Sequence, residues 1–250
     1  MNLRLLTYNI QRGGVGRVER LAHVINACQP DIVLLQEATD LDTVHRLASL
    51  TQMTTSASFR QQSLGYLSRR PVTASWHRPG LSRHAFIEIV TEEGTRVFGV
   101  HLSAIHSPIT EQRRVYELRA LLQSIAQHQK GFHVLAGDFN TLAPNERLDV
   151  SRLPWRLRPF VWMGGRQIRW RTIQAVLDAG YVDAFRSCHR DEAGLTMPTW
   201  DPHVRLDYVF VPRAYEGRIA RCEVVSSTEA TTASDHFPVV IDLLTEPVAA

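Results

Sequence analysis

The sequence predicts an α/β fold. Apolar runs of strand length alternate along the chain with segments whose apolar residues recur at helical spacing. Carboxylate, amide and imidazole side chains stand at the ends of several of these apolar runs. The 250 residues are enough to bury a large core without a disulfide or structural metal. Because no internal repeat or low-complexity linker interrupts this pattern, we expect residues 1–250 to form a single domain.

Apolar runs predict the strands. The segment 31–35 is almost wholly apolar, as expected of a strand that is buried on both faces. The segments 85–90 and 96–102 flank Glu92-Glu93-Gly94, a sequence typical of a hairpin turn. The predicted strands cover residues 3–10, 31–35, 85–90, 96–102, 132–136, 206–211, 222–225 and 238–243.

Amphipathic spacing predicts the helices. One face of the segment 18–28 is apolar throughout, and Pro30 follows its end. The longest helical pattern covers residues 109–129, with Gly131 after it as a stop signal. A third helix is expected over residues 172–179.

The charge of the chain is almost entirely arginine. The formal net charge is +3, and Lys130 is the single lysine in the sequence. Arginine has a planar fork that suits phosphate recognition, so this composition favours an anionic partner. A codon bias of the genome would produce the same composition, and that alternative stays open.

Cysteine usage and the N-terminus bear on location. Cys28, Cys188 and Cys222 are far apart and odd in number, which fits neither a disulfide framework nor a zinc site. The N-terminus lacks the apolar stretch of a signal peptide, and no segment approaches the roughly 20 apolar residues of a membrane span. We therefore expect a soluble, cytoplasmic protein with no transmembrane segment and no protein partner.

Costly polar residues recur where the predicted strands begin or end. A carboxylate in such a place requires a partner, a set of hydrogen bonds or a metal. Oxygen ligands with few nitrogens favour a hard cation such as Mg²⁺. The residues concerned are Glu37, His101, Asp138, Asn140, Asp207, Asp235 and His236.

Each residue taken singly has a structural alternative. Asp138 could cap a turn with Asn140, and Asp207 could pair with Arg205. A histidine in an apolar strand, such as His101, could be a satisfied core residue. It is their joint occurrence that indicates a site.

These residues lie in a recognisable order of motifs. The motifs are Thr7-Tyr8-Asn9-Ile10, Leu35-Gln36-Glu37, Gly99-Val100-His101-Leu102, Gly137-Asp138-Phe139-Asn140, Arg205-Leu206-Asp207-Tyr208 and Ser234-Asp235-His236-Phe237-Pro238. The chain thereby resembles the endonuclease/exonuclease/phosphatase superfamily, which includes AP endonucleases, pancreatic-type deoxyribonucleases, sphingomyelinases and inositol-polyphosphate phosphatases. The resemblance implies a four-layer α/β/β/α sandwich of two mixed β-sheets flanked by helices, with the site at one sheet edge.

The resemblance also implies roles for the individual residues. Glu37 would be the principal ligand of Mg²⁺, or of Mn²⁺ as a substitute, with Asn9 and Asp235 nearby. Asp138 would position or deprotonate the attacking water, and Asn140 would orient that water or a phosphate oxygen.

Two histidines complete the set. His236 would contact the phosphoryl oxygens and share in proton transfer, with Asp207 holding its tautomer. His101 would contact the phosphate or protonate the leaving oxygen. AP endonucleases typically carry a tyrosine at the place of His101, and some carry an aspartate at the place of Gln11. Both differences point away from a dedicated AP endonuclease.

A segment rich in arginine and tryptophan, residues 144–171, follows Asp138 and Asn140. Such interleaving is typical of a surface that grips phosphates and stacks bases. A loop with packed tryptophans and solvated arginines, or a lip that meets a lipid surface, would have the same composition. The candidate substrate-binding residues are Arg156, Arg158, Arg169, Trp155 and Trp162.

The sequence thus predicts a metal-dependent phosphoesterase that hydrolyses phosphodiester bonds with water, with a nuclease as the leading hypothesis. Nucleic acid is the expected partner. An enzyme acting on lipid or small-molecule phosphate esters is the alternative within the same chemistry. The alternative of another class is a catalytically silent nucleic-acid-binding module.

Overall fold

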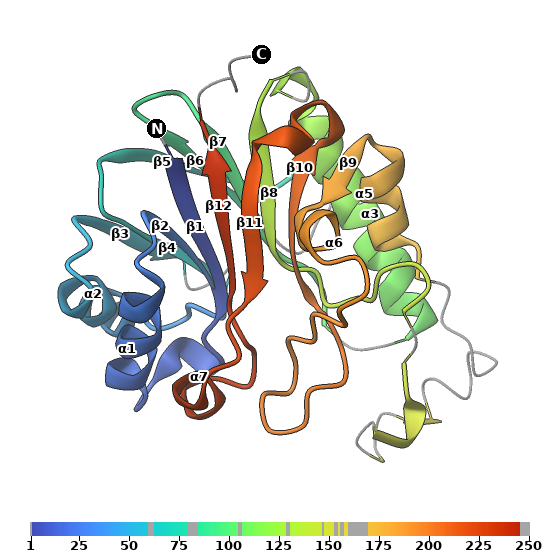
Figure 1. Cartoon of the computed structure of the whole chain (residues 1–250), viewed down its shortest axis with the longest axis horizontal. Helices are drawn as coiled ribbons and strands as arrows, with labels where there is room; N and C mark the ends of the chain where they lie inside the picture. The colour runs from blue at the N-terminus through green and yellow to red at the C-terminus, as the bar shows by residue number, and fades with distance from the viewer. Residues whose placement is uncertain are drawn as a thin grey trace.

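The computed structural model contains two six-stranded β-sheets packed face to face, with helices on both outer sides (Figure 1). The structure describes residues 2–59, 63–79, 85–104, 107–128, 131–146, 148–152, 155, 158–159 and 170–245.

The first sheet has the strand order β11-β12-β1-β2-β4-β3. Its strands are β1 (Asn2–Asn9), β2 (Ile32–Gln36), β3 (Thr55–Phe59), β4 (Leu64–Ser68), β11 (Ile219–Val224) and β12 (Val239–Leu244). β1 is central and pairs with β2 in parallel and with β12 antiparallel. Every residue of β2 is buried, which explains its unbroken apolar sequence.

The second sheet has the order β5-β6-β7-β8-β10-β9. Its strands are β5 (Val72–His77), β6 (Phe86–Thr91), β7 (Arg96–His101), β8 (His133–Asp138), β9 (Tyr181–Asp183) and β10 (Asp207–Pro212). β7 and β8 are parallel, whereas β8 and β10 are antiparallel.

The helices form the outer layers. α1 (Val18–Cys28), α2 (Leu41–Leu50) and α7 (Thr228–Ala233) cover the first sheet, and α3 (Pro108–Ser124) and α5 (Thr172–Asp178) cover the second (Figure 1). The short α6 (Ala184–Cys188) packs between β10 and β11, at the margin where the two sheets meet. No helix among the described residues is long and apolar enough to cross a membrane.

Three apolar cores separate these layers. Leu5 and Leu34 of the first sheet meet Val97 and Val134 of the second in the central core. The outer core of the first sheet includes Tyr8 and packs on α1 and α2. The outer core of the second includes Phe98 and packs on α3 and α5. The predicted four-layer α/β/β/α sandwich is therefore confirmed.

Most predicted elements occur within one or two residues of their expected bounds. The exceptions have local causes. The predicted helix 109–129 ends earlier, at Ser124, and a 3-10 turn over Ala126–His128 follows it. The predicted strand 222–225 is the second half of β11. Helices α2, α6 and α7 and strands β3, β4, β5 and β9 were not predicted; β3 is polar and only half-buried, so it lacks the apolar signal.

The strand directions bring one set of strand ends together. The carboxyl ends of β1, β2, β7 and β8 and the amino ends of β10 and β12 all lie at the same end of the sandwich, the lower end in Figure 1. The motif residues lie at this end, on central strands of both sheets. The lateral edge strands β3, β11, β5 and β9 carry none of these residues.

Candidate active site

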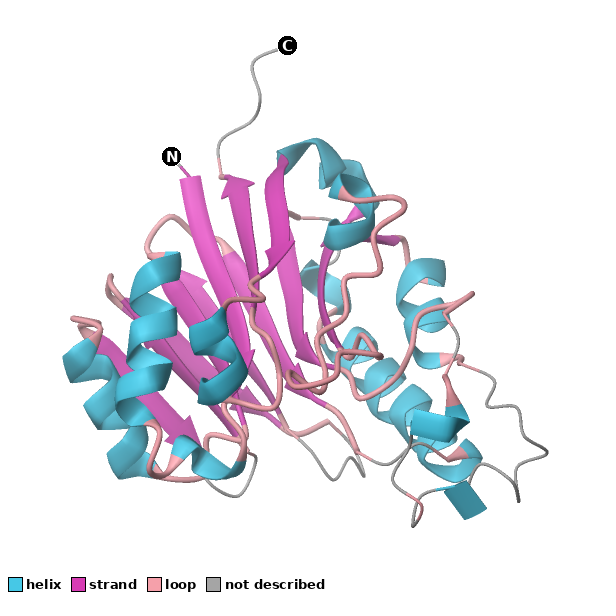
Figure 2. Cartoon of the chain, turned by 60° about the horizontal axis from the view of Figure 1, so that its bottom comes forward, coloured by secondary structure: helices cyan, strands magenta, loops and turns pink. Residues whose placement is uncertain are grey.

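Strand register places the predicted residues opposite one another. Asp138, the last residue of β8, is paired with Asp207, the first residue of β10, and with His101, the last residue of β7. Asn9 ends β1, and Glu37 follows β2 directly. Figure 2 turns this end of the sandwich toward the viewer. Residues from distant parts of the chain therefore form one polar group.

His236 and Asp207 form a buried pair. His236 Nδ1 lies 2.8 Å from Asp207 Oδ2, and both side chains are almost fully enclosed. Arg205 does not take part, because its guanidinium forms ion pairs with Asp183 at 2.7 Å and Glu146 at 2.8 Å. The alternative pairing of Asp207 with Arg205 was therefore wrong.

The two oxygens of Asp138 have different partners. Oδ1 accepts the Asn140 backbone N–H at 2.8 Å, which is the turn that the sequence allowed as an alternative. Oδ2 accepts from Asn9 Nδ2 at 3.0 Å and lies 3.8 Å from His101 Nε2. The turn and the site thus use different oxygens of one carboxylate.

Glu37 borders this group on the side of the first sheet. Its Oε1 lies 3.4 Å from Asn9 Nδ2, and its Oε2 accepts the Arg12 backbone N–H at 2.5 Å. Asn9 Oδ1 accepts the Gln11 N–H at 3.0 Å, so Asn9 directs its amide nitrogen, not its oxygen, toward Glu37 and Asp138. The Asn9 amide links the two carboxylates into one continuous site.

Burial and neighbouring charges shift two pKa values in the site. Burial raises the pKa of Asp138, and the negative charge of Asp207 raises it further, against the opposing effect of His236. Burial disfavours the charged form of His236, but Asp207, Asp138 and Asp235 outweigh it and raise the pKa of His236 to about 10. The imidazole is therefore a stable proton holder at neutral pH, beside a carboxylate that holds a proton more readily than an ordinary aspartate.

The backbone around Asp138 is closely constrained. Gly137 has φ 143°, and a Cβ atom there would lie 2.0 Å from the carbonyl oxygen of Val100. Asn140 has φ 52° and donates its Nδ2 to the Leu102 carbonyl at 3.0 Å. That bond leaves the Asn140 Oδ1 lone pairs for other partners. The glycine lets β8 approach β7 closely enough to align Asp138 with His101.

Asp235 and Ser234 connect the last motif to the first. Ser234 Oγ donates to the Asn9 carbonyl at 2.6 Å, which joins the segment before β12 to the end of β1. The backbone N–H of Thr199 donates to the Asp235 carbonyl at 3.0 Å. The carboxylate of Asp235 is half-exposed, and among the described residues its one hydrogen bond is accepted from Ser234 Oγ at 3.5 Å.

The side chains present fit a hard cation. Asp138, Asp207 and His236 offer ligand atoms that lie within 4.8 Å of one another, and Asp207 Oδ1 is buried without a hydrogen-bond partner among the described residues. Glu37 and Asp235 lie outside that cluster and are half-exposed. Mg²⁺ keeps several waters when bound, so the half-exposed carboxylates suit it better than the dry cluster does.

The loop 195–204 was missed by the sequence analysis. It lies against the Asp235 segment through Thr199, and the next residue, Trp200, is 69% exposed. An exposed indole beside a polar site has an apolar face and a polar N–H that can both contact a ligand. The signal in the sequence was an aromatic residue within the polar stretch Thr199-Trp200-Asp201-Pro202.

Part of the arginine- and tryptophan-rich segment also borders the site. Trp155 is 73% exposed, and Arg158 donates to the Ser151 carbonyl at 2.7 Å. An ion pair of 3.1 Å between Arg152 and Asp201 joins this segment to the loop of Trp200. The other predicted substrate-binding residues, Arg156, Arg169 and Trp162, lie outside the described residues.

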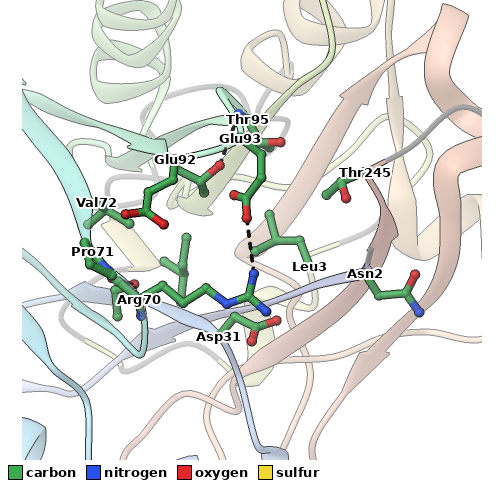
Figure 3. Close-up of a pocket in the computed structure, with 13 residues that line it drawn as sticks. Asn2, Leu3, Asp31, Arg70, Pro71, Val72, Glu92, Glu93, Thr95 and Thr245 are labelled. Atoms are coloured by element: carbon green, nitrogen blue, oxygen red, sulfur yellow. Dashed lines mark hydrogen bonds and ion pairs between the residues drawn. The ribbon is translucent and has the colours of Figure 1, made fainter.

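A small cavity lies at the opposite end of the sandwich, among the first residues of β1 and the turn between β6 and β7 (Figure 3). It is bordered by Arg70, which forms an ion pair with Glu93 at 3.2 Å. Its volume of about 30 Å³ is suited to one water molecule, not to a phosphate ester. This cavity is therefore not a candidate for the active site.

Solved structures share this fold over nearly the whole chain. The 3′ phosphatase NExo from Neisseria, bound to a product DNA hairpin, superposes with a TM-score of 0.75 at 21% identity, covering 96% of this chain and 99% of that one. An AP endonuclease from Archaeoglobus fulgidus gives 0.74 at 18%, covering 96% and 98%. An endonuclease/exonuclease/phosphatase from Beutenbergia cavernae gives 0.74 at 23%, covering 97% and 71%.

No curated protein matches the chain. The model of the endonuclease/exonuclease/phosphatase family, however, matches residues 6–236, a range that contains five of the six motifs in full and the sixth as far as His236. The chain belongs to the endonuclease/exonuclease/phosphatase family.

Proposed function

We propose that this chain is a magnesium-dependent nuclease that hydrolyses phosphodiester bonds with an activated water. The observation that carries the proposal is the continuous group Glu37–Asn9–Asp138, which joins a half-exposed carboxylate to buried carboxylates beside His236. A hydrolase of the endonuclease/exonuclease/phosphatase type is already given by the family. The proposal adds three points to this: the metal is magnesium, the bond cleaved is a phosphodiester, and the substrate is a nucleic acid.

The proposed metal site is at Glu37 and Asp235, with Asn9 nearby. A bound Mg²⁺ would stabilise the negative charge that develops on the phosphoryl oxygens. Glu37 is fixed for this role by the Arg12 N–H, and Asp235 by the backbone contact of its carbonyl with Thr199.

Asp138 is the proposed residue that positions the water and accepts its proton. Its Oδ1 is fixed by the Asn140 N–H, so its Oδ2 faces the site in a defined direction. The raised pKa of Asp138 makes it a stronger base than an ordinary aspartate. Asn140 would orient the water or a phosphate oxygen through its Oδ1.

His236 and His101 are the proposed contacts to the phosphoryl and leaving oxygens. The Nδ1 of His236 is held by Asp207, which leaves Nε2 to donate to a phosphoryl oxygen. His101 lies on the other side of Asp138, where it could protonate the leaving oxygen. The proposed metal ligands are half-exposed, so a charged substrate can reach them from solvent. The enclosed imidazole of His236 would then contact that substrate inside the site.

Nucleic acid is the proposed substrate because of the surroundings of the site. Trp155 and Trp200 are exposed on neighbouring segments, and Arg158 lies on the first of them. Exposed indoles can stack on bases, and arginines contact phosphates. The DNA hairpin bound by the Neisseria 3′ phosphatase supports a nucleic-acid substrate for the same fold.

The test is to incubate the protein with labelled single- and double-stranded DNA and RNA, with Mg²⁺, with Mn²⁺ and with EDTA. Bis-(p-nitrophenyl) phosphate serves as a generic diester, and the Asp138→Asn variant reports contamination. We expect metal-dependent cleavage of one polymer that the variant loses. Cleavage of the generic diester alone would move the substrate to lipid or small-molecule phosphate esters. Binding of nucleic acid without any cleavage would indicate the silent binding module instead.

A further inference from the structure

We infer that Arg17 is a positioning residue for the metal site: its guanidinium holds the strained loop 10–16 that directs a backbone N–H at Glu37, and joins this loop to the segment that carries Asp235. The inference rests on the proposed function, because it takes Glu37 and Asp235 as the metal ligands. Among the described residues, the guanidinium of Arg17 donates to backbone carbonyls and to neither carboxylate.

The loop is strained along most of its length. Gln11, Arg12, Gly13 and Gly14 have positive φ angles in succession, from 50° to 74°. A positive φ angle is unfavourable for a residue with a side chain, and both Gln11 and Arg12 adopt one. Such a loop persists only where surrounding contacts stabilise it.

The strained backbone conformation directs a set of N–H groups toward the site. Three successive backbone N–H groups point at the site: Gln11 donates to Asn9 Oδ1 at 3.0 Å, Arg12 to Glu37 Oε2 at 2.5 Å, and Gly13 to the Glu37 carbonyl at 2.8 Å. Both the side chain and the backbone of Glu37 are therefore fixed by this loop. Relaxation of the loop would release the carboxylate.

Arg17 supplies the contacts that stabilise the loop. Its Nη2 donates to the carbonyl of Ile10 at 2.9 Å and to that of Gln11, and its Nη1 donates to the carbonyl of Ala233 at 2.5 Å. Ala233 is the last residue of α7, two residues before Asp235. One planar guanidinium thus links the two segments that carry the proposed metal ligands.

The position of Arg17 in its helix supports a role for the side chain. Arg17 is the N-cap residue of α1, where Ser, Thr, Asp or Asn is preferred, and it makes no side-chain cap. A cation at the N-terminus of a helix is also opposed by the helix dipole. The residue is unfavourable for its own helix, so its contribution lies in the three carbonyl contacts.

The test is direct metal binding by Arg17→Ala, Arg17→Lys and a matched control, Arg20→Ala. Arg20 lies on α1 and reaches α7 through the Thr232 carbonyl at 3.4 Å, but among the described residues its side chain forms no hydrogen bond with loop 10–16. Binding is measured from the free Mn²⁺ signal in electron paramagnetic resonance, well below the melting temperature of every variant. Hydrolysis of bis-(p-nitrophenyl) phosphate is followed against Mn²⁺ concentration.

We expect Arg17→Ala to raise the Mn²⁺ dissociation constant at least tenfold, and Arg20→Ala to change it less than twofold. Arg17→Lys should be intermediate, since one ammonium cannot span all three carbonyls, and it replaces Arg17→Ala if that variant does not fold. The rate of Arg17→Ala at saturating Mn²⁺ should return to within about threefold of the wild type, whereas general destabilisation would lower the rate at every metal concentration.

Two results overturn the inference, and they are distinguishable. Wild-type Mn²⁺ affinity in folded Arg17 variants would show that the loop holds Glu37 without the guanidinium, and would leave the proposed function intact. A wild-type protein that binds no Mn²⁺ would remove the metal site itself, and the proposed function with it.

Discussion

At the scale of single residues, the Asp138 carboxylate serves both the fold and the site. One oxygen closes the turn to Asn140, and the other faces Asn9 and His101. An amide at this position can still accept the Asn140 N–H, so the turn can survive while the negative charge is lost. Substitution to asparagine therefore separates the chemical contribution of Asp138 from its structural one.

We predict that Asp138→Asn lowers kcat for bis-(p-nitrophenyl) phosphate by about 10²–10⁴-fold, the range typical of a lost general base. The matched control is Asp178→Asn, which makes the same change at an exposed position of α5 and should retain full activity. Circular dichroism melting checks the fold. A near-wild-type rate for a folded Asp138→Asn protein would refute the assignment.

The backbone conformation at Gly137 leads to a prediction about the free energy of unfolding. Alanine there would carry a Cβ 2.0 Å from the Val100 carbonyl oxygen at φ 143°. We expect Gly137→Ala to lower the free energy of unfolding by about 3 kcal/mol through steric overlap and backbone strain. Gly217→Ala is the control, because nothing lies within 4 Å of its Cβ position. Urea unfolding measures both, and equal stability of the two variants would contradict the prediction.

At the scale of elements, helix α3 anchors the loops that follow β7 and β8. Glu111 is buried and accepts from Thr141 Oγ1 at 2.7 Å, from the Arg171 N–H at 2.7 Å and from the Thr172 N–H at 2.8 Å. Arg114 pairs with Glu111 at 2.9 Å and donates to the Ser103 carbonyl at 2.7 Å. One ion pair on α3 therefore fixes the residues next to Asn140, the start of α5 and the loop after His101.

This network predicts a pH dependence. Burial disfavours the charged form of Glu111, but Arg114, Thr141 and Thr172 outweigh it and hold its pKa below the usual 4.5. A lowered pKa contributes stability that is present above about pH 4.5 and is lost as the pH falls through the lower folded value. We expect Glu111→Gln to lose about 3 kcal/mol at pH 7 and to lose less further stability in acid than the wild type.

Urea unfolding between pH 3 and pH 7 measures this difference. Glu19→Gln is the control, since Glu19 forms an exposed ion pair with Arg46 and should leave the pH profile unchanged. If Glu111→Gln and the wild type lose stability in parallel below pH 4.5, the depressed pKa of Glu111 is not a source of acid sensitivity.

At the scale of the whole molecule, the surroundings of the site decide the substrate. We predict that Trp155→Ala and Arg158→Glu each raise KM for the cleaved polymer about tenfold at low salt, from lost stacking and lost phosphate contact. The same variants should hydrolyse bis-(p-nitrophenyl) phosphate at the wild-type rate, because that diester is too small to reach these side chains. An unchanged KM for the polymer would make this segment structural.

The central strands of the two sheets were predicted from the sequence more completely than the edge strands. Strands β1, β2, β7 and β8 carry dense apolar runs and were found, whereas the equally buried β4 was not, because its sequence includes Gly65 and Ser68 and only two aliphatic residues. The edge strand β3 was not found, since a half-exposed strand needs little apolar sequence. The expected single domain and the cytoplasmic location stay predictions.

The sequence by itself determined the alternating fold class, the family and the identity of the residues that gather at one end of the sandwich. These follow from local periodicity and from motifs, which are properties of neighbouring residues. Tertiary structure alone decided the partners: Asp207 faces His236 and not Arg205, and the Asn9 amide joins Glu37 to Asp138. The roles inferred for Arg17 and Trp200 likewise became visible only in the structure, where segments far apart in the sequence contact each other. Pairing between residues that are 28 to 129 positions apart depends on strand direction and register, and no local pattern encodes either.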